Sequence, residues 1–164
     1  MNTSVSMNER FNPEKNISDM GLSLPAETPA PIGAFSNTRQ VGNLLYVSGQ
    51  GPVTSDGEYL TGKVGADVSV AQANEHAKLV GLNILSAVKT HCGSLDKVTA
   101  VVKLLGMVNA TPEFSQHPAV IDGCSSLLHK VFGAKGIHAR SAFGVASLPN
   151  QISVEIEAIF EIED

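Results

Sequence analysis

The sequence lacks several features that would place it in a large protein class. No apolar run approaches the roughly 18 residues that a membrane-spanning helix needs, and the polar N-terminus has no apolar core of a signal peptide. Positive charge is sparse, because 11 Lys and Arg residues are scattered among 16 Asp and Glu, which leaves a net charge of −5. Nucleic-acid-binding domains usually carry a basic patch. We therefore expect a cytoplasmic protein that binds neither a membrane nor a nucleic acid.

Cysteine is also rare, and the histidines are poorly spaced for a metal. Cys92 and Cys124 lie far apart, so the sequence gives no sign of a disulfide-stabilised secreted protein. The five histidines show no three- or four-residue spacing and form no zinc-ligand pattern with the cysteines. The glycine patterns of nucleotide-binding loops and the G-x-S-x-G pattern of a serine nucleophile are missing too. We expect a protein without a metal or an organic cofactor.

What remains is the composition of one folded domain. The chain has 164 residues, of which 43% are hydrophobic and 16% charged, and this length is sufficient for one apolar core. Residues 1–20 are polar, and we expect them to form a flexible N-terminal extension. Residues 21–164 are then the folded domain. Its first part, 24–33, carries three prolines and is expected to be extended.

Seven segments show the hydrophobic periodicity of strands or helices. The clearest begins with a capping box at Ser69 and Gln72 and ends at Gly93, which predicts a long amphipathic helix. The last segment alternates apolar with polar residues, which predicts a half-buried strand. In chain order, the segments are two strands of a hairpin within 39–53, a helix over 69–93, a central strand over 98–110, a helix over 118–133 and two strands within 138–162.

The order ββ-α-β-α-ββ predicts a protein of the α+β class, with its strands in one sheet. Two helices of this length can cover only one face of such a sheet. The other face must then meet solvent or another subunit.

Arg140 is the residue that most indicates a binding site. It opens a strand with no other charged residue, and Ala142, Gly144 and Ala146 follow it on its own side of that strand. An arginine fork in such a roomy apolar setting suits a bidentate carboxylate ligand. A carboxylate on a neighbouring strand, such as Glu155, could orient a water as a general base. A structural ion pair between Arg140 and the acids explains the same residues, and both interpretations stay open.

Three segments resemble one known family. They are "NLLYVSGQGPV", "VVKLLGMVN" and, most specifically, "ARSAFGVASLPNQISVEIEAIF". Together they resemble the reactive intermediate deaminases (the RidA or YjgF family, also called endoribonuclease L-PSP-like), over about residues 30–162. The resemblance implies a chorismate-mutase-like α+β fold with one mixed sheet and two helices on one face. It also implies a homotrimer whose sites lie between neighbouring subunits.

The same resemblance implies a reaction and its residues. The family hydrolyses enamines and imines of small 2-keto acids to the keto acid and ammonia, and needs no cofactor. By position, Arg140 would bind the carboxylate of the substrate and Glu155 would orient the attacking water, with Ser48 and Gly49 near the substrate. His138, two residues before Arg140, lies either at the rim of the site or simply in the preceding loop.

Three positions depart from the family's pattern. Phe35 replaces a tyrosine before the first strand, Asp122 replaces an asparagine of the second helix, and Ala142 replaces a cysteine after the arginine. The chain is also longer than typical members, at its N-terminus and around residues 133–138. We therefore expect a divergent subgroup whose substrate can differ. Two alternatives to the deaminase stay open: another C–N hydrolase on the same scaffold, and a non-catalytic trimer that binds a small ligand.

Overall fold

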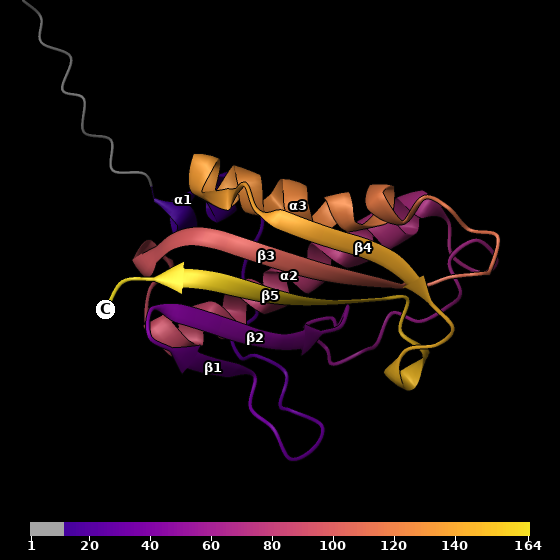
Figure 1. Cartoon of the computed structure of the whole chain (residues 1–164), viewed down its shortest axis with the longest axis horizontal. Coiled ribbons are helices and arrows are strands. Elements are labelled where there is room, and N and C mark those ends of the chain that lie inside the picture. Colours follow the sequence, from indigo (N-terminus) through magenta and orange to yellow (C-terminus); the bar gives the residue numbers. More distant parts are fainter. Residues whose placement is uncertain (1–11) are drawn as a thin grey trace, which may run out of the picture.

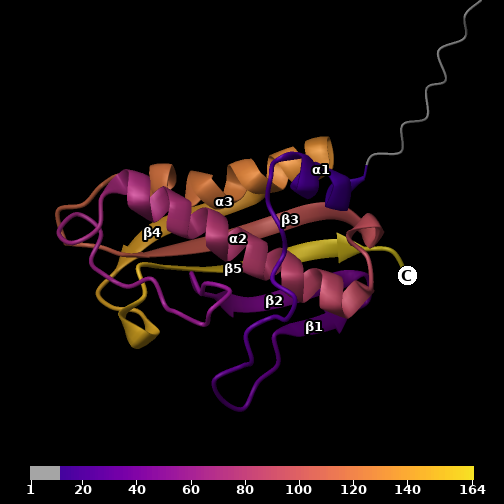
Figure 2. The same ribbon diagram turned by 180° about the vertical axis from the view of Figure 1, so that it is seen from behind.

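The computed structural model describes residues 12–164 and contains one five-stranded sheet. Two long helices, α2 (Val70–Cys92) and α3 (His117–Phe132), cover one face of this sheet, and no long helix of the described chain lies on the opposite face (Figures 1 and 2). The strands are β1 (Thr38–Val41), β2 (Leu44–Gln50), β3 (Val98–Asn109), β4 (Ala139–Val145) and β5 (Val154–Ile162). The predicted α+β class and the order ββ-α-β-α-ββ are confirmed.

The strands lie in the order β1-β2-β5-β3-β4, so the last strand of the sequence is at the centre of the sheet. β5 pairs antiparallel with both β2 and β3, whereas β3 and β4 run parallel. A parallel pair cannot be joined by a hairpin and needs a crossover. α3 makes that crossover on the covered face (Figure 1). The sheet is therefore mixed, as expected.

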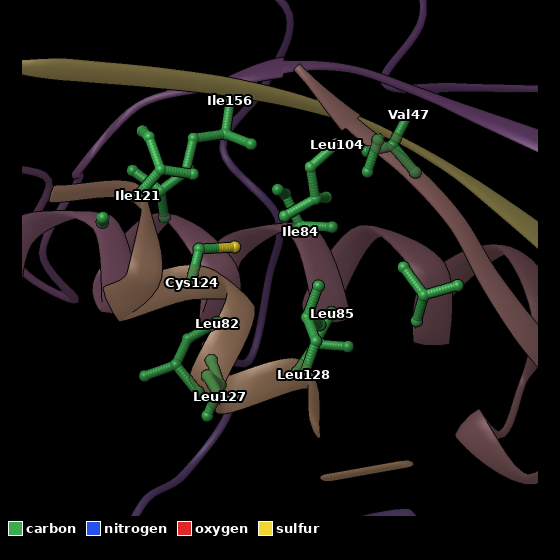
Figure 3. Close-up of a cluster of buried hydrophobic side chains, with 14 of the residues drawn as sticks. Val47, Leu82, Ile84, Leu85, Leu104, Ile121, Cys124, Leu127, Leu128 and Ile156 are labelled. Atoms are coloured by element: carbon green, nitrogen blue, oxygen red, sulfur yellow. The ribbon is translucent and has the colours of Figure 1, made fainter. Parts of the chain in front are cut away.

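The core fills the space between the sheet and the two helices. The predicted alternation of β5 is confirmed, since its buried residues are Val154, Ile156, Ala158, Phe160 and Ile162. In Figure 3 the side chains of α2 and α3 meet in one cluster, with the thiol of Cys124 among them. Complete burial raises the pKa of this thiol to about 12. Cys124 is thus a packing residue rather than a nucleophile.

α2 begins and ends where the sequence predicts. The Oγ of Ser69 accepts the backbone N–H of Gln72 at 3.1 Å, and the Oε1 of Gln72 accepts the N–H of Ser69 at 2.9 Å. Gly93 ends the helix in the left-handed conformation with φ 82°. α3 begins one residue before the predicted start and has Pro118 in its first turn.

The sequence did not predict the helix α1 (Pro13–Asp19). The structure therefore corrects the expectation of a flexible extension for these residues, while residues 1–11 of that extension lie outside the described part of the chain. Ile17 is 3% exposed, and the side-chain amide of Asn16 donates to the carbonyl of Val131 in α3 at 3.0 Å. α1 is thus part of the packed structure.

Gly123 lies where α3 packs against α2, and it should not tolerate a side chain. A Cβ at this position would collide with the backbone carbonyl oxygen of Asn74. We expect Gly123→Ala to lower the free energy of unfolding by about 1–3 kcal/mol, the usual cost of overpacking, even though alanine favours a helix by about 1 kcal/mol over glycine. Chemical denaturation measures the change.

Gly81→Ala, in α2, is the matched control. Its Cβ would meet the end of the Leu127 side chain at 2.8 Å, and a side-chain terminus can move aside whereas a backbone carbonyl cannot. Gly81→Ala should therefore cost less than Gly123→Ala. Equal stability of Gly123→Ala and the wild type would contradict the close approach of the two helices.

Candidate active site

The strand pairing shows that Arg140 lies on the covered face of the sheet. Residues directly opposite each other on paired strands project to the same side. Arg140 is opposite Leu104 of β3, which is in turn opposite Ala158 of β5. Leu104 and Ala158 are 0% and 3% exposed because both face the helices. Arg140 therefore points toward the layer of α3.

Glu155 lies on the uncovered face. It is opposite Met107 of β3, which is opposite Phe143 of β4, and Phe143 is 42% exposed. Strand β3 separates β4 from β5, so the two predicted catalytic residues are neither on neighbouring strands nor on the same face. The expectation that Glu155 lies on a strand next to Arg140 is therefore wrong within one chain, and so is the alternative of an ion pair between these two residues.

The side chain of Arg140 is held by α3. Its Nη1 donates to Oδ1 of Asp122 at 2.7 Å and to Oγ of Ser125 at 3.1 Å. Arg140 is 23% exposed and Asp122 is 57% exposed at the side chain. Nη2 and Nε have no partner among the described residues, so this edge of the guanidinium is available to a ligand. The structure does contain an ion pair of Arg140, but with Asp122 and not with an acid of β5.

His138 belongs to the same cluster. Its Nδ1 lies 2.7 Å from the carbonyl oxygen of Gly136, and its Nε2 lies 2.9 Å from Oγ of Ser125. A carbonyl can only accept, so we assign the proton of the neutral ring to Nδ1, and Ser125 then donates to Nε2. Burial lowers the pKa of His138, with a smaller contribution from the charge of Arg140, against the opposing effect of the Gly136 carbonyl. The ring is thus mainly neutral at pH 7.

Arg140, Ser125 and His138 border a hollow of about 280 Å³, and we call them, with Asp122, the arginine half-site. The hollow also contains Ser126, His129, Gly136 and Ile137. Ala142 is two residues beyond Arg140 on the same face, but it packs against the hydrophobic core and does not line this hollow.

Glu155 lies in a second hollow, of about 320 Å³, which we call the glutamate half-site. Phe35 and Gly49 line it together with Glu155. A Cβ at Gly49 would lie 3.0 Å from the carboxylate of Glu155, so glycine leaves room for this group. Ser48 does not line the hollow, but its hydroxyl donates to the Ser36 carbonyl at 2.7 Å and so fixes the segment that carries Phe35.

The carboxyl of Glu155 is tuned by its surroundings. Burial raises its pKa, and the charge of Glu157 on the same strand raises it further. A raised pKa makes a carboxylate a better proton acceptor.

In the same hollow, Asn150 has a φ of 53°, and Gln151 follows it with a φ of 56°. Two successive left-handed residues make a tight turn just before β5, a conformation that is uncommon outside glycine.

A larger hollow of about 520 Å³ lies elsewhere, between α1 and the end of α2. An ion pair crosses it, with Nζ of Lys89 3.2 Å from Oε1 of Glu14. Its volume would favour this hollow as the candidate active site, but neither Arg140 nor Glu155 lines it. We therefore place the site at the two half-sites.

The described residues contain no group of three or more His, Cys, Asp and Glu side chains that could hold a metal ion. Over the same residues, no helix is both long enough and apolar enough to cross a membrane.

Sequence reasoning missed Ser125, which connects Arg140 to His138. The sequence contained one weak indication of this role. Ser125 follows Asp122 by three residues, and this spacing places both side chains on one face of a helix. Tyr59 and Asn150 of the glutamate half-site were also missed. They come from loops, whose positions no periodicity predicts.

The comparison with protein families identifies the fold. A family model described as "YjgF/chorismate_mutase-like, putative endoribonuclease" matches residues 14–160, which is nearly the whole described chain. The chain belongs to this family. The predicted family is thereby confirmed, together with its chorismate-mutase-like architecture.

Individual members of the family are similar over most of their length. Protein TCP17 of Trypanosoma cruzi is 37% identical over 150 residues, which are 91% of this chain and 93% of that protein. The 2-iminobutanoate/2-iminopropanoate deaminase of Escherichia coli (strain K12) is 36% identical over 136 residues, covering 80% and 89%. The crystal structure of Atu1372 from Agrobacterium tumefaciens, a protein of unknown function, is 45% identical with a TM-score of 0.84, covering 92% and 94%.

The lowered pKa of His138 predicts a pH-dependent stability. A histidine whose pKa falls on folding binds fewer protons in the folded state, so stability is lost as the pH drops below about 6.5, the ordinary value. The slope from one such group is at most about 1.4 kcal/mol per pH unit. We expect denaturant titrations between pH 7.5 and 5 to show a shallower loss for His138→Gln than for the wild type.

His129→Gln serves as the control, because His129 is exposed on α3 and its ring has no hydrogen-bond partner among residues 12–164. Its pH profile should follow that of the wild type. If His138→Gln and the wild type lose stability in parallel, the ring of His138 is not held neutral by the arginine half-site.

Proposed function

We propose that this protein is a hydrolytic deaminase of small enamines and imines of 2-keto acids, which releases the keto acid and ammonia. A relative of 36% identity, named 2-iminobutanoate/2-iminopropanoate deaminase, supports this substrate class. Membership of the family alone does not decide the reaction, because TCP17 and Atu1372 carry no such name. The argument therefore depends on the two half-sites.

The observation that carries the proposal is that the half-sites are complementary. The hollow of Glu155 has no Lys, Arg or His in its lining. That of Arg140 has no Asp or Glu in its lining, since Asp122 pairs with Arg140 from outside this hollow. A carboxylate-bearing imine needs a cationic clamp and a base at once. Each hollow supplies one of them, so a complete site requires that the arginine half-site of one chain meets the glutamate half-site of another.

An assembly of this kind would also cover the open face of the sheet. Tyr46 and Phe143 project from that face and are 43% and 42% exposed. Large apolar side chains on an uncovered sheet face are typical of an interface. We infer a homotrimer in which these faces meet in the interior and each of the three sites lies between two neighbouring subunits. Its mass should be about three times the 17.2 kDa of the chain.

In such a site the free edge of Arg140 would bind the carboxylate of the substrate through two parallel N–H bonds. Glu155 of the neighbouring chain would accept a proton from a water whose oxygen attacks the imine carbon. The proton taken from the water returns to the nitrogen of the resulting carbinolamine. The C–N bond then breaks as the hydroxyl group of the carbinolamine gives up its proton, so that ammonia leaves and the carbonyl of the keto acid forms.

Mixing two inactive variants tests both the reaction and the shared site. Glu155→Gln should lower turnover of enzymatically generated 2-aminoacrylate by about 10²–10⁴-fold, the usual contribution of a general base. Arg140→Ala should lack the carboxylate clamp and be inactive as well. When the two variants are unfolded together and refolded as mixed trimers, about a quarter of the sites should combine an intact Arg140 with an intact Glu155. Ammonia release should therefore return to about a quarter of the wild-type rate.

If each site took both residues from one chain, no mixture would contain an intact site, and activity would stay at the level of the variants. Glu157→Gln, on the same strand and face, is the control and should retain most of its activity. An unchanged rate for Glu155→Gln would leave a ligand-binding protein in place of a deaminase.

Arg140→Lys should be nearly as damaging as Arg140→Ala. Lysine keeps the charge but cannot form two parallel bonds to a carboxylate, and a lost charge-assisted hydrogen bond costs about 1.5–3 kcal/mol. Calorimetric titration with pyruvate or 2-ketobutyrate should show affinity reduced by about tenfold or more. Tight binding by Arg140→Lys would contradict the bidentate clamp.

A C–N hydrolase acting on a different small acid is the second candidate. Asp122 and Phe35 favour it, because both lie in the half-sites at positions where the family's pattern has asparagine and tyrosine. The two changes leave Arg140 and Glu155 in place, so they bear on the choice of substrate.

A further inference from the structure

Asp122 places a second charge at the ligand-binding end of Arg140. Its Oδ1 lies 2.7 Å from Nη1, and it is the only acid paired with Arg140 among the described residues. The side chain of Asp122 is 57% exposed, so its charge is not hidden from a ligand beside it. An asparagine at this position could accept the same hydrogen bond without carrying a charge.

The arginine half-site is consequently close to neutral. The positive charge of Arg140 is balanced by Asp122, and His138 is held in its neutral form between Ser125 and Gly136. A ligand carboxylate can still bind the Nη2 and Nε edge of the guanidinium. It would then lie about 6 Å from the carboxylate of Asp122, where two like charges near a protein surface repel.

We propose that Asp122 determines specificity, by favouring ligands that carry a cationic nitrogen beside their carboxylate over ligands that carry the carboxylate alone. This inference rests on the proposed function and names its substrate class more closely. The protonated imine of a 2-keto acid is a zwitterion with no net charge, whereas the keto acid that forms from it is an anion. The charge of Asp122 repels the anion, whereas its net electrostatic interaction with the zwitterion is close to zero. Asp122 therefore discriminates the product from the substrate.

Discrimination of this kind speeds product release. Hydrolysis replaces the cationic nitrogen with a neutral carbonyl oxygen while the carboxylate stays on Arg140. After hydrolysis, the net electrostatic interaction between the bound keto acid and Asp122 is therefore repulsive. The keto acid therefore binds more weakly than the molecule from which it was made, and it does not accumulate on the enzyme.

Asp122→Asn tests the inference without relying on turnover. Pyruvate serves as the anionic probe and alanine as the zwitterionic probe of the same carbon skeleton, and both are titrated calorimetrically. Removal of the negative charge should tighten pyruvate binding by about three- to tenfold, as expected for like charges about 6 Å apart near the surface. Alanine binding should change by less than about twofold. In turnover assays, inhibition by added pyruvate should strengthen by the same factor.

Two further variants make the result specific. Asp122→Ser removes the charge with a different side chain and should shift the pyruvate-to-alanine ratio in the same direction. Asp96→Asn is the matched control, because Asp96 lies before β3 begins, and Arg140 pairs with Leu104 well along that strand. The same loss of charge about 20 Å away should leave the ratio unchanged.

The outcomes separate this inference from the proposed function. If wild type binds both probes and Asp122→Asn alters both affinities equally, or neither, then Asp122 does not discriminate and the deaminase proposal stands. If wild type binds neither probe, there is no carboxylate site at Arg140, and both proposals fail. A pyruvate-specific gain in Asp122→Asn and Asp122→Ser, absent in Asp96→Asn, supports the inference.

Discussion

The parallel pairing of β3 with β4 is the constraint on which the arginine half-site depends. Because parallel neighbours need a crossover, α3 must run back over the sheet between them, and it lies above the inward-facing row of β4. Arg140 belongs to that row, so its guanidinium meets the side chains of Asp122 and Ser125 near the middle of α3. The close approach of α3 to α2 at Gly123, one residue after Asp122, fixes the helix in this position.

A strand exposes alternate residues on its two faces, and this period of two separates the reactive groups. On β5 the even-numbered residues complete the core, and Glu155 is left on the open side with a raised pKa. In a single copy of the chain, the candidate base Glu155 thus lies on the open face of the sheet. The candidate carboxylate-binding residue Arg140 lies on the covered face. The two groups are therefore too far apart to act on one ligand within a single copy of the chain, and the proposed assembly of several copies would bring them together.

Local patterns predicted the elements well, because their causes are local. The capping box of Ser69 and Gln72 and the alternation of β5 each lie within a few residues, and both are present as expected. The contact between Arg140 and Asp122 depends on a crossover, and no local pattern reveals it. α1 was missed for another reason. A helix of seven residues is unstable alone, so its cap at Asn12 was too little to predict it, and the docking of Ile17 provides the rest.

The attachment of α1 to the far end of α3 has a practical consequence for anyone who produces the protein. The same helix that carries Asp122 and Ser125 near its middle accepts a hydrogen bond from Asn16 at Val131, near its C-terminal end. A recombinant chain begun at residue 21, after the polar N-terminal segment, would lack α1 and would expose the core residues that pack against Ile17. The truncation would create a new exposed apolar patch, which favours aggregation. Poor yield or precipitation of such a chain would then result from the chosen start position and not from low stability of the complete fold.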